Sequence, residues 1–166
     1  MMKKILGWVK EIVLALVMLT VILNIISFLK KPELASSTLP SFALTTIEKK
    51  EINTNMYHNK PLMIHFWATW CPTCKLEAST IESLSKEYQV LSIAVNSGDD
   101  DEIKLFMDSH KLTYDVINDR DGTFAEKFSV SSFPTTFIYD KDAKIKFSEV
   151  GYSSTLGLKL RMWMAK

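Results

Sequence analysis

The sequence predicts an α/β protein in which a mixed β-sheet is flanked by helices and preceded by a single N-terminal transmembrane helix. Three observations support this class. A long apolar run lies near the N-terminus, strand and helix patterns alternate through the middle of the chain, and a strand hairpin and an amphipathic helix close it. We divide the chain into a membrane anchor over residues 1–31, a linker over residues 32–40 and a folded domain over residues 41–166.

The apolar run over residues 12–29 has the length that a bilayer requires. Its eighteen residues, at about 1.5 Å each, span roughly 27 Å. Apolar residues lie all round this helix and no clear small-x-small cleavage site follows it, so we expect an uncleaved anchor. Three lysines before the run outnumber the two directly after it, which favours an internal N-terminus and an external domain.

The next segments predict a polar linker and three strands. Residues 32–40 contain two prolines and a Ser-Ser-Thr cluster, and residues 41–47 and 51–54 are predicted to be short strands around a charged turn. Residues 62–67 have no amphipathic period, which predicts a strand buried on both faces, as in a parallel sheet.

Cys71-Pro72-Thr73-Cys74 lies where that strand meets a helix predicted over residues 71–88. One helical turn separates the two sulfurs, so they can close a small disulfide. Cys71 stands at the helix start, where unpaired N–H groups and the helix dipole favour a thiolate. Pro72 suits the first helical position because its missing N–H is not needed there. We interpret Cys71 as the attacking thiol and Cys74 as the shielded resolving thiol.

A Cys-x-x-Cys pair has other uses as well. A zinc site needs two more ligands, but no other cysteine exists and His58, His65 and His110 form no recognisable spacing. A structural bridge across so short a loop adds little stability. A copper-binding module could combine both cysteines with Met63 or His65 as soft ligands. The favoured interpretation, a redox dithiol, needs no organic cofactor and no metal.

The rest of the chain continues the alternation of strands and helices. Acidic residues at positions 99–102 open a helix, and capping is favoured over a calcium site because the EF-hand spacing is absent. The other predicted elements are strands over residues 90–95, 114–117, 136–139 and 145–150 and helices over residues 123–128 and 156–164. The 20 basic and 19 acidic residues give a net charge of +1, which argues against a nucleic-acid partner.

The order of these elements around Trp-Cys-x-x-Cys and Phe-Pro-Thr-Thr-Phe resembles the thioredoxin fold. Residues 66–74 are similar to its membrane-anchored, extracytoplasmic branch of TlpA-like, ResA-like and cytochrome c maturation proteins. Residues 95–100, 118–122 and 156–165 resemble the suppressor-of-copper-sensitivity D (ScsD-like) subgroup. The resemblance implies a protein thiol–disulfide oxidoreductase held by a single pass in the bacterial inner membrane, with its catalytic domain in the periplasm.

The resemblance also implies the surroundings of the cysteines. Pro134 would be the cis-proline of the fold, and the backbone of Phe133 would pair with an extended client segment. Trp70 and Phe133 would make apolar contacts to that segment, although Phe133 would equally suit the core. Pro72 and Thr73 complete the expected substrate-binding set; Thr73 either hydrogen-bonds the Cys71 sulfur or is an ordinary first-turn residue.

His65 departs from the family pattern. Thioredoxins place a buried acid six residues before the first cysteine, and His65 holds that position here. If its pKa stays near 7, its imidazole can accept the proton of Cys74; the alternative is a buried histidine that only supports packing. Glu77, three residues after Cys74, is a second candidate that faces either solvent or the site.

The expected partners are thiol- or disulfide-containing client proteins, which would form a mixed disulfide with Cys71. A membrane thiol-electron transporter is the redox partner that the resemblance implies. The sequence leaves the net direction of exchange open. The alternatives are a cytochrome c maturation thiol reductase and the copper-binding module. An acidic insert near the site would favour the reductase, and the sequence has no clear one.

Overall fold

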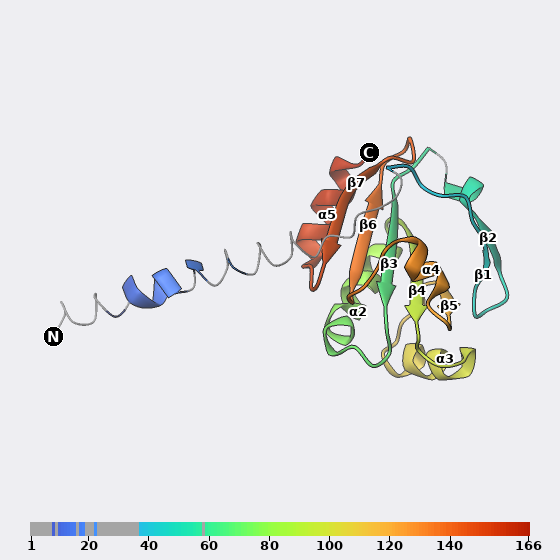
Figure 1. Cartoon of the computed structure of the whole chain (residues 1–166), viewed down its shortest axis with the longest axis horizontal. Helices are drawn as coiled ribbons and strands as arrows, with labels where there is room; N and C mark the ends of the chain where they lie inside the picture. The colour runs from blue at the N-terminus through green and yellow to red at the C-terminus, as the bar shows by residue number, and fades with distance from the viewer. Residues whose placement is uncertain (1–7, 9, 16, 19–21, 23–36, 58) are drawn as a thin grey trace. The chain divides into compact units, whose positions relative to one another are not determined.

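The computed structural model describes residues 8, 10–15, 17, 18, 22, 37–57 and 59–166, in two compact units that divide between Lys31 and Pro32 (Figure 1). In the first unit the described residues are helical. Among the described residues no helix is both long and apolar enough to cross a membrane. Most of the predicted anchor lies outside the described residues.

The second unit contains a five-stranded mixed sheet and a separate two-stranded sheet. The large sheet has the order β5-β4-β3-β6-β7, in which β3 pairs in parallel with β4 and antiparallel with β6. The elements are β1 (Ala43–Thr45), β2 (Glu51–Asn53), the 3-10 helix η1 (Thr54–Tyr57), β3 (Leu62–Trp67), α2 (Pro72–Ser85), β4 (Gln89–Val95), α3 (Asp100–Ser109), β5 (Val116–Asp119), α4 (Thr123–Lys127), β6 (Thr135–Tyr139), β7 (Ile145–Val150) and α5 (Thr155–Met164). The predicted mixed sheet flanked by helices is confirmed.

The central strand β3 is buried on both faces, as predicted from its lack of period. Met63 and Trp67 belong to the core cluster that contains both cysteines and residues of α2, α3 and α5. Leu62, Ile64 and Phe66 belong to the second cluster, with residues of α4. Because alternate side chains of a strand point to opposite faces, His65 lies on the same face as Met63 and Trp67.

Several element boundaries differ from the sequence prediction, and β5 is shifted at both ends. The fifth strand begins at Val116 and ends at Asp119, whereas the pattern predicted residues 114–117. Asn118 and Asp119 lie beyond the predicted strand, but they are strand residues because they pair in register with Ala94 and Val95. Polar side chains at the end of a parallel strand hide this from a reading of hydrophobicity alone.

The acidic start of α3 forms a helix cap, as predicted. Asp99 accepts a hydrogen bond from the N–H of Glu102 at 2.9 Å, and the Glu102 carboxylate accepts one from the N–H of Asp99 at 2.9 Å. This reciprocal capping box satisfies two N–H groups that the helix leaves free.

Candidate active site

The Cys-x-x-Cys segment turns the chain directly from β3 into α2. Cys71 is the N-cap residue of α2, with extended backbone angles, and Pro72 follows in the first turn. The backbone N–H of Cys74 donates a hydrogen bond to Cys71 Sγ at 3.2 Å. This N–H belongs to the first turn, whose donors have no partner within the helix, so the helix itself supplies a donor to the first sulfur.

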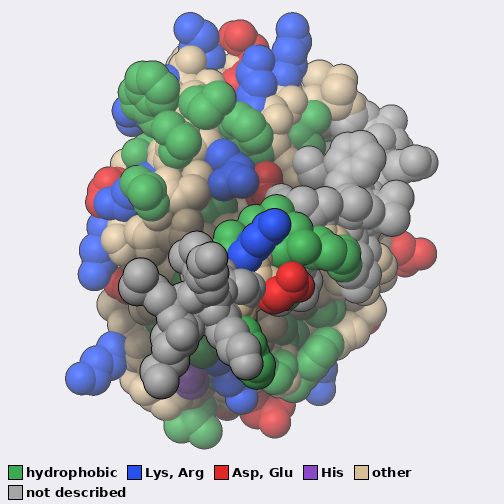
Figure 2. Space-filling view, turned by 90° about the vertical axis from the view of Figure 1, so that its left-hand side faces the viewer, with side chains coloured by type: hydrophobic (Ala, Val, Ile, Leu, Met, Phe, Trp, Pro, Cys, Tyr) green, Lys and Arg blue, Asp and Glu red, His purple; other side chains and the backbone are tan. Residues whose placement is uncertain are grey.

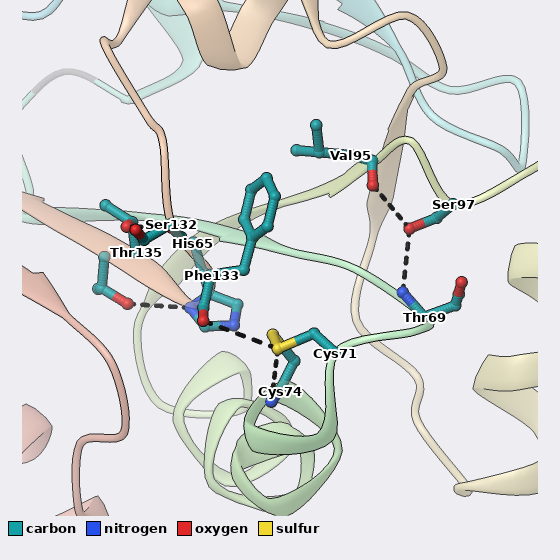
Figure 3. Close-up of a disulfide and its surroundings, with 10 residues drawn as sticks. His65, Thr69, Cys71, Cys74, Val95, Ser97, Ser132, Phe133 and Thr135 are labelled. Atoms are coloured by element: carbon teal, nitrogen blue, oxygen red, sulfur yellow. Dashed lines mark hydrogen bonds between the residues drawn. A yellow bond between two sulfur atoms is a disulfide. The ribbon is translucent and has the colours of Figure 1, made fainter.

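The two cysteines form a disulfide, with their Cα atoms 5.3 Å apart (Figure 3). Both residues are nearly buried, with 4% of Cys71 and 2% of Cys74 exposed. In contrast, Trp70 is 58% exposed. Trp70 is therefore accessible from solvent, whereas the two cysteines beside it are largely covered.

The loop before β6 lies against the first sulfur. The Phe133–Pro134 peptide bond is cis, and the carbonyl oxygen of Phe133 lies 3.7 Å from Cys71 Sγ (Figure 3). The rings of Trp70 and Phe133 meet edge to face, with centroids 5.8 Å apart. Phe133 is half-buried and also packs against both core clusters, so it serves the core as well as the site.

A hollow of about 570 Å³ lies beside these two rings. The end of β4, the start of α4 and the loop before Pro134 form its walls. Trp70 is held at its edge by a hydrogen bond from Nε1 to the carbonyl oxygen of Asn96 at 3.0 Å. Asp121 and Glu126 also line it. The sequence did not indicate this hollow, because its walls come from segments far apart in the chain.

The remaining predicted site residues lie on the first turn of α2. Pro72 is exposed and Thr73 is half-buried. The donor to Cys71 Sγ is the backbone N–H of Cys74. Of Pro72 and Thr73, Pro72 is therefore the more accessible from solvent.

His65 is buried in the sheet, with 2% of its surface exposed. Its Nδ1 lies 2.9 Å from the Thr136 hydroxyl, which faces it across the β3–β6 pair. Burial lowers the pKa of His65 from 6.5 to about 3. The condition for the proton-acceptor role, a pKa near 7, is therefore not met. The geometry fits the packing alternative, and a base this weak is a poor acceptor for a thiol proton.

Glu77 is fully buried on α2, so of its two predicted orientations the solvent-facing one is wrong. Oε1 accepts a hydrogen bond from the backbone N–H of Ser153 at 3.0 Å, and Oε2 has no hydrogen-bond partner among the described residues. Burial raises the pKa of Glu77 from 4.5 to about 7, and the hydrogen bond from Ser153 offsets part of this rise. Since residues three apart on a helix are neighbours, this carboxyl lies on the side of α2 that carries Cys74.

The connection between β7 and α5 joins Glu77 to the cis-proline loop, which sequence reasoning missed. The N–H of Gly151 donates to the carbonyl oxygen of Pro134 at 2.8 Å. Two residues later Ser153 binds Glu77. One short connection thus holds both the loop beside Cys71 and the buried acid behind Cys74.

The copper-binding alternative requires several ligand side chains close together in space. Within the described part of the chain, no three or more His, Cys, Asp or Glu residues are grouped so that they could hold a metal ion. Met63 and His65 share the face of the sheet that carries both cysteines.

Comparison with known proteins places this site in a family. Residues 35–148 match the AhpC/TSA family. A thioredoxin-like protein of Haemophilus influenzae is 31% identical over 151 residues, which cover 88% of this chain and 87% of that protein. The thiol-disulfide oxidoreductase ResA of Geobacillus thermodenitrificans is 33% identical over 114 residues, or 66% of each chain.

Solved structures show the same fold. A thiol:disulfide interchange protein of the thioredoxin family from Chlorobium tepidum has a TM-score of 0.68 at 22% identity, covering 80% of this chain and 98% of that one. A secreted Mycobacterium tuberculosis disulfide oxidoreductase homologous to DsbE has a TM-score of 0.65 at 23% identity, covering 74% and 95%. The thioredoxin-like fold that the sequence resembled is therefore confirmed.

Proposed function

The chain belongs to the AhpC/TSA family, and from this premise we propose that it is a membrane-anchored, extracytoplasmic enzyme that exchanges disulfides with client proteins through Cys71 and Cys74. The broader activity, a thiol–disulfide oxidoreductase of the ResA/DsbE type, follows from its relatives. One observation carries the residue assignment. The disulfide lies at the N-terminus of α2 with the carbonyl oxygen of Phe133 3.7 Å from its first sulfur.

In the reducing direction the Cys71 thiolate attacks one sulfur of a client disulfide. The client S–S bond breaks, a mixed disulfide forms and one client thiolate leaves. Cys74 then gives up its proton and attacks Cys71 Sγ, which releases the second client thiolate and closes the Cys71–Cys74 bond. The client gains two electrons and the enzyme loses two; the oxidising direction is the reverse.

We assign the acceptance of the Cys74 proton to Glu77. A proton acceptor works best when its pKa lies near the working pH, and Glu77 meets this condition with a pKa raised to about 7. His65 does not, since burial lowers its pKa to about 3. His65 instead holds Thr136 across the β3–β6 pair, a positioning role.

Client binding is proposed at the cis-proline loop. Backbone groups of Phe133 lie beside Cys71, so an extended client segment that pairs with them brings its own cysteine to Sγ. The exposed ring of Trp70, which meets the ring of Phe133, offers that segment an apolar contact. Pro72 and Thr73 border the sulfurs on α2 and help to set the balance between dithiol and disulfide.

Trapping of mixed disulfides tests the two cysteine roles. A Cys74→Ser variant keeps the attacking thiol but cannot resolve, so we expect it to accumulate covalent complexes with clients that a reductant releases. A Cys71→Ser variant should form none and should lose insulin disulfide reduction. Complexes that form equally well through Cys74 alone would reverse the assigned roles.

The anchor is proposed from residues 12–29 and places the domain in the periplasm. Fractionation tests this: the full chain should remain with membranes after alkaline carbonate washing, and deletion of residues 12–29 should release it. A membrane-impermeant thiol reagent should label reduced Cys71 in intact spheroplasts. Labelling only after lysis would place the domain on the other side.

A membrane thiol-electron transporter is the proposed redox partner, and the ScsD-like proteins are the proposed subgroup.

One observation favours a second candidate function, that of a cytochrome c maturation thiol reductase. Asp121 and Glu126 line the hollow beside Trp70 and give it acidic character. Faster reduction of an apocytochrome Cys-x-x-Cys-His peptide than of insulin, lost in an Asp121→Asn/Glu126→Gln variant, would select this candidate.

A further inference from the structure

The last helix, α5, is apolar on two opposite sides. Leu158, Met162 and Ala165 are buried against the core. Four more large apolar side chains of the same helix are exposed, namely Leu156 (79%), Leu160 (54%), Trp163 (64%) and Met164 (55%). We call these four residues the outer face of α5. Figure 2, which views the side of the molecule that carries α5 and β7, shows hydrophobic side chains gathered on this surface.

This outer face is a continuous stripe, not a scatter of single residues. Leu156, Leu160 and Trp163 are separated by four and three positions, so they follow one another along the helix. On α3, by comparison, the one exposed large apolar side chain among the described residues is Leu105. A contiguous exposed apolar patch marks a surface that something covers.

Two basic side chains of α5 are already paired with acidic residues of other elements. Lys159 pairs with Glu87, and Arg161 Nε lies 3.0 Å from a Glu149 carboxylate oxygen. From position 150 to the end the sequence has no acidic residue. A partner that covers the stripe therefore has to be matched by apolar contact.

The start of the domain lies close to the β7 edge of the sheet, beside α5. The described part of the domain begins at Ser37, whose carbonyl oxygen accepts a hydrogen bond from the N–H of Ile145 at 2.8 Å, at the start of β7. The Arg161–Glu149 pair fastens α5 to the same edge strand, and α5 runs beside β7 (Figure 1). The chain thus enters the domain on the side that carries the outer face.

The tether is short. Residues 30–36 separate the proposed anchor from Ser37, and seven residues reach at most about 25 Å when fully extended. If the anchor spans the bilayer, the β7 edge cannot move far from the lipid surface. Leucine and tryptophan together on one helix face are typical of segments that lie in the membrane interface.

We propose that the outer face of α5, formed by Leu156, Leu160, Trp163 and Met164, lies in the interfacial layer of the bilayer that holds the anchor. This rests on the anchoring proposed above. The contact fixes the orientation of the domain, so that α2 and the disulfide stay at one height above the membrane. Because the contact is apolar, it needs no anionic lipid.

Quenching of tryptophan by brominated lipid tests this in the full chain. The chain is reconstituted in phosphatidylcholine vesicles with and without bromine on the acyl chains near the headgroups. Trp8 and Trp163 are two of its four tryptophans. We expect Trp163→Phe to remove part of the lipid-quenchable emission, and Trp8→Phe to remove the part that reports the anchor.

A matched pair of variants separates the helix face from general effects. Leu156→Glu and Leu105→Glu both change an exposed leucine, at 79% and 72% exposure. Leu156→Glu should lower the Trp163-dependent quenching, and Leu105→Glu should leave it unchanged. If Trp8 is quenched and Trp163 is not, the membrane contact is wrong while the anchor stands. If neither is quenched, both are wrong.

Discussion

The two faces of the central sheet differ in what they bury. The face toward α4 packs aromatic rings against one another, and Tyr139 is a buried titratable residue among them. Phe66 lies at the centre, with ring centroids 5.2 Å from Phe128, 5.9 Å from Phe137 and 6.1 Å from Phe124. Such packing stabilises a domain through apolar area, and the Tyr139 hydroxyl is a buried polar atom of this face without a hydrogen-bond partner among the described residues.

The face toward α2 buries polar and reactive groups instead. It carries the disulfide, His65 and Ser92, and α2 adds Glu77. Burial moves the pKa of His65 down to about 3 and that of Glu77 up to about 7. One face thus supplies stability and the other accepts the cost of burial where thiol chemistry requires it.

The largest expected effect is on the aromatic face. Phe128 is fully buried against Phe66 and Phe137. Phe128→Ala leaves a cavity and should lower the free energy of unfolding by about 3–5 kcal/mol, as measured by chemical denaturation. The folded variant should still reduce insulin, because Phe128 belongs to the core cluster on the face of the sheet opposite the disulfide. A loss below about 1 kcal/mol would mean that the face repacks around the gap.

On the polar face, His65 should make stability depend on acid. Its pKa is about 3 when folded and 6.5 otherwise, so protonation favours the unfolded chain. The stability that neutral His65 contributes is present above pH 6.5 and is lost as pH falls toward 3. The expected slope is about 1.4 kcal/mol per pH unit. Chemical denaturation at several pH values should show this slope in the wild type and not in His65→Asn. An equal slope in the wild type and the variant would contradict the assignment to His65.

Glu77 should have the opposite dependence. Its pKa rises from 4.5 to about 7 on folding, so the folded chain holds the proton more tightly. This contribution is present below pH 4.5 and is lost as pH rises through about 7. Across this pH range the free energy of unfolding should fall by about 3 kcal/mol on account of Glu77. The Glu77→Gln variant should lack this pH dependence.

The same variant has a kinetic readout. If Glu77 accepts the Cys74 proton, the resolving rate of the wild type should rise with pH around 7, where its carboxyl ionises. In Glu77→Gln this inflection should disappear while mixed-disulfide formation by Cys71 continues. An unchanged inflection would assign the proton to another group and leave Glu77 a structural role only.

The contrast between the two faces also separates what the sequence could predict from what it could not. The strand, the N-cap cysteine and the helix over residues 62–85 were readable, because each depends on its neighbours in the chain. The burial of Glu77 was not, because its partner Ser153 lies 76 positions away. His65 was placed on the sheet, but the sequence left its role open between proton acceptor and packing residue, because nothing local reveals complete desolvation.

The smallest expected effect concerns a single hydrogen bond on the polar face. Trp67 Nε1 donates to the hydroxyl of Ser92 at 2.7 Å, and Ser92 is fully buried. Ser92→Ala leaves the indole N–H without an acceptor, which should cost about 1–3 kcal/mol of unfolding free energy.

A double-mutant cycle with Trp67→Phe isolates this bond. Phenylalanine has no N–H, so adding Ser92→Ala to Trp67→Phe should cost much less than Ser92→Ala costs alone. Equal costs in both backgrounds would show that Ser92 acts through packing and that the indole is satisfied elsewhere. A second double-mutant cycle on Phe66 and Phe137, on the opposite face, should report only apolar contact. Comparing the two coupling energies shows how much polar pairing adds on the face that carries the disulfide, relative to ring packing on the other.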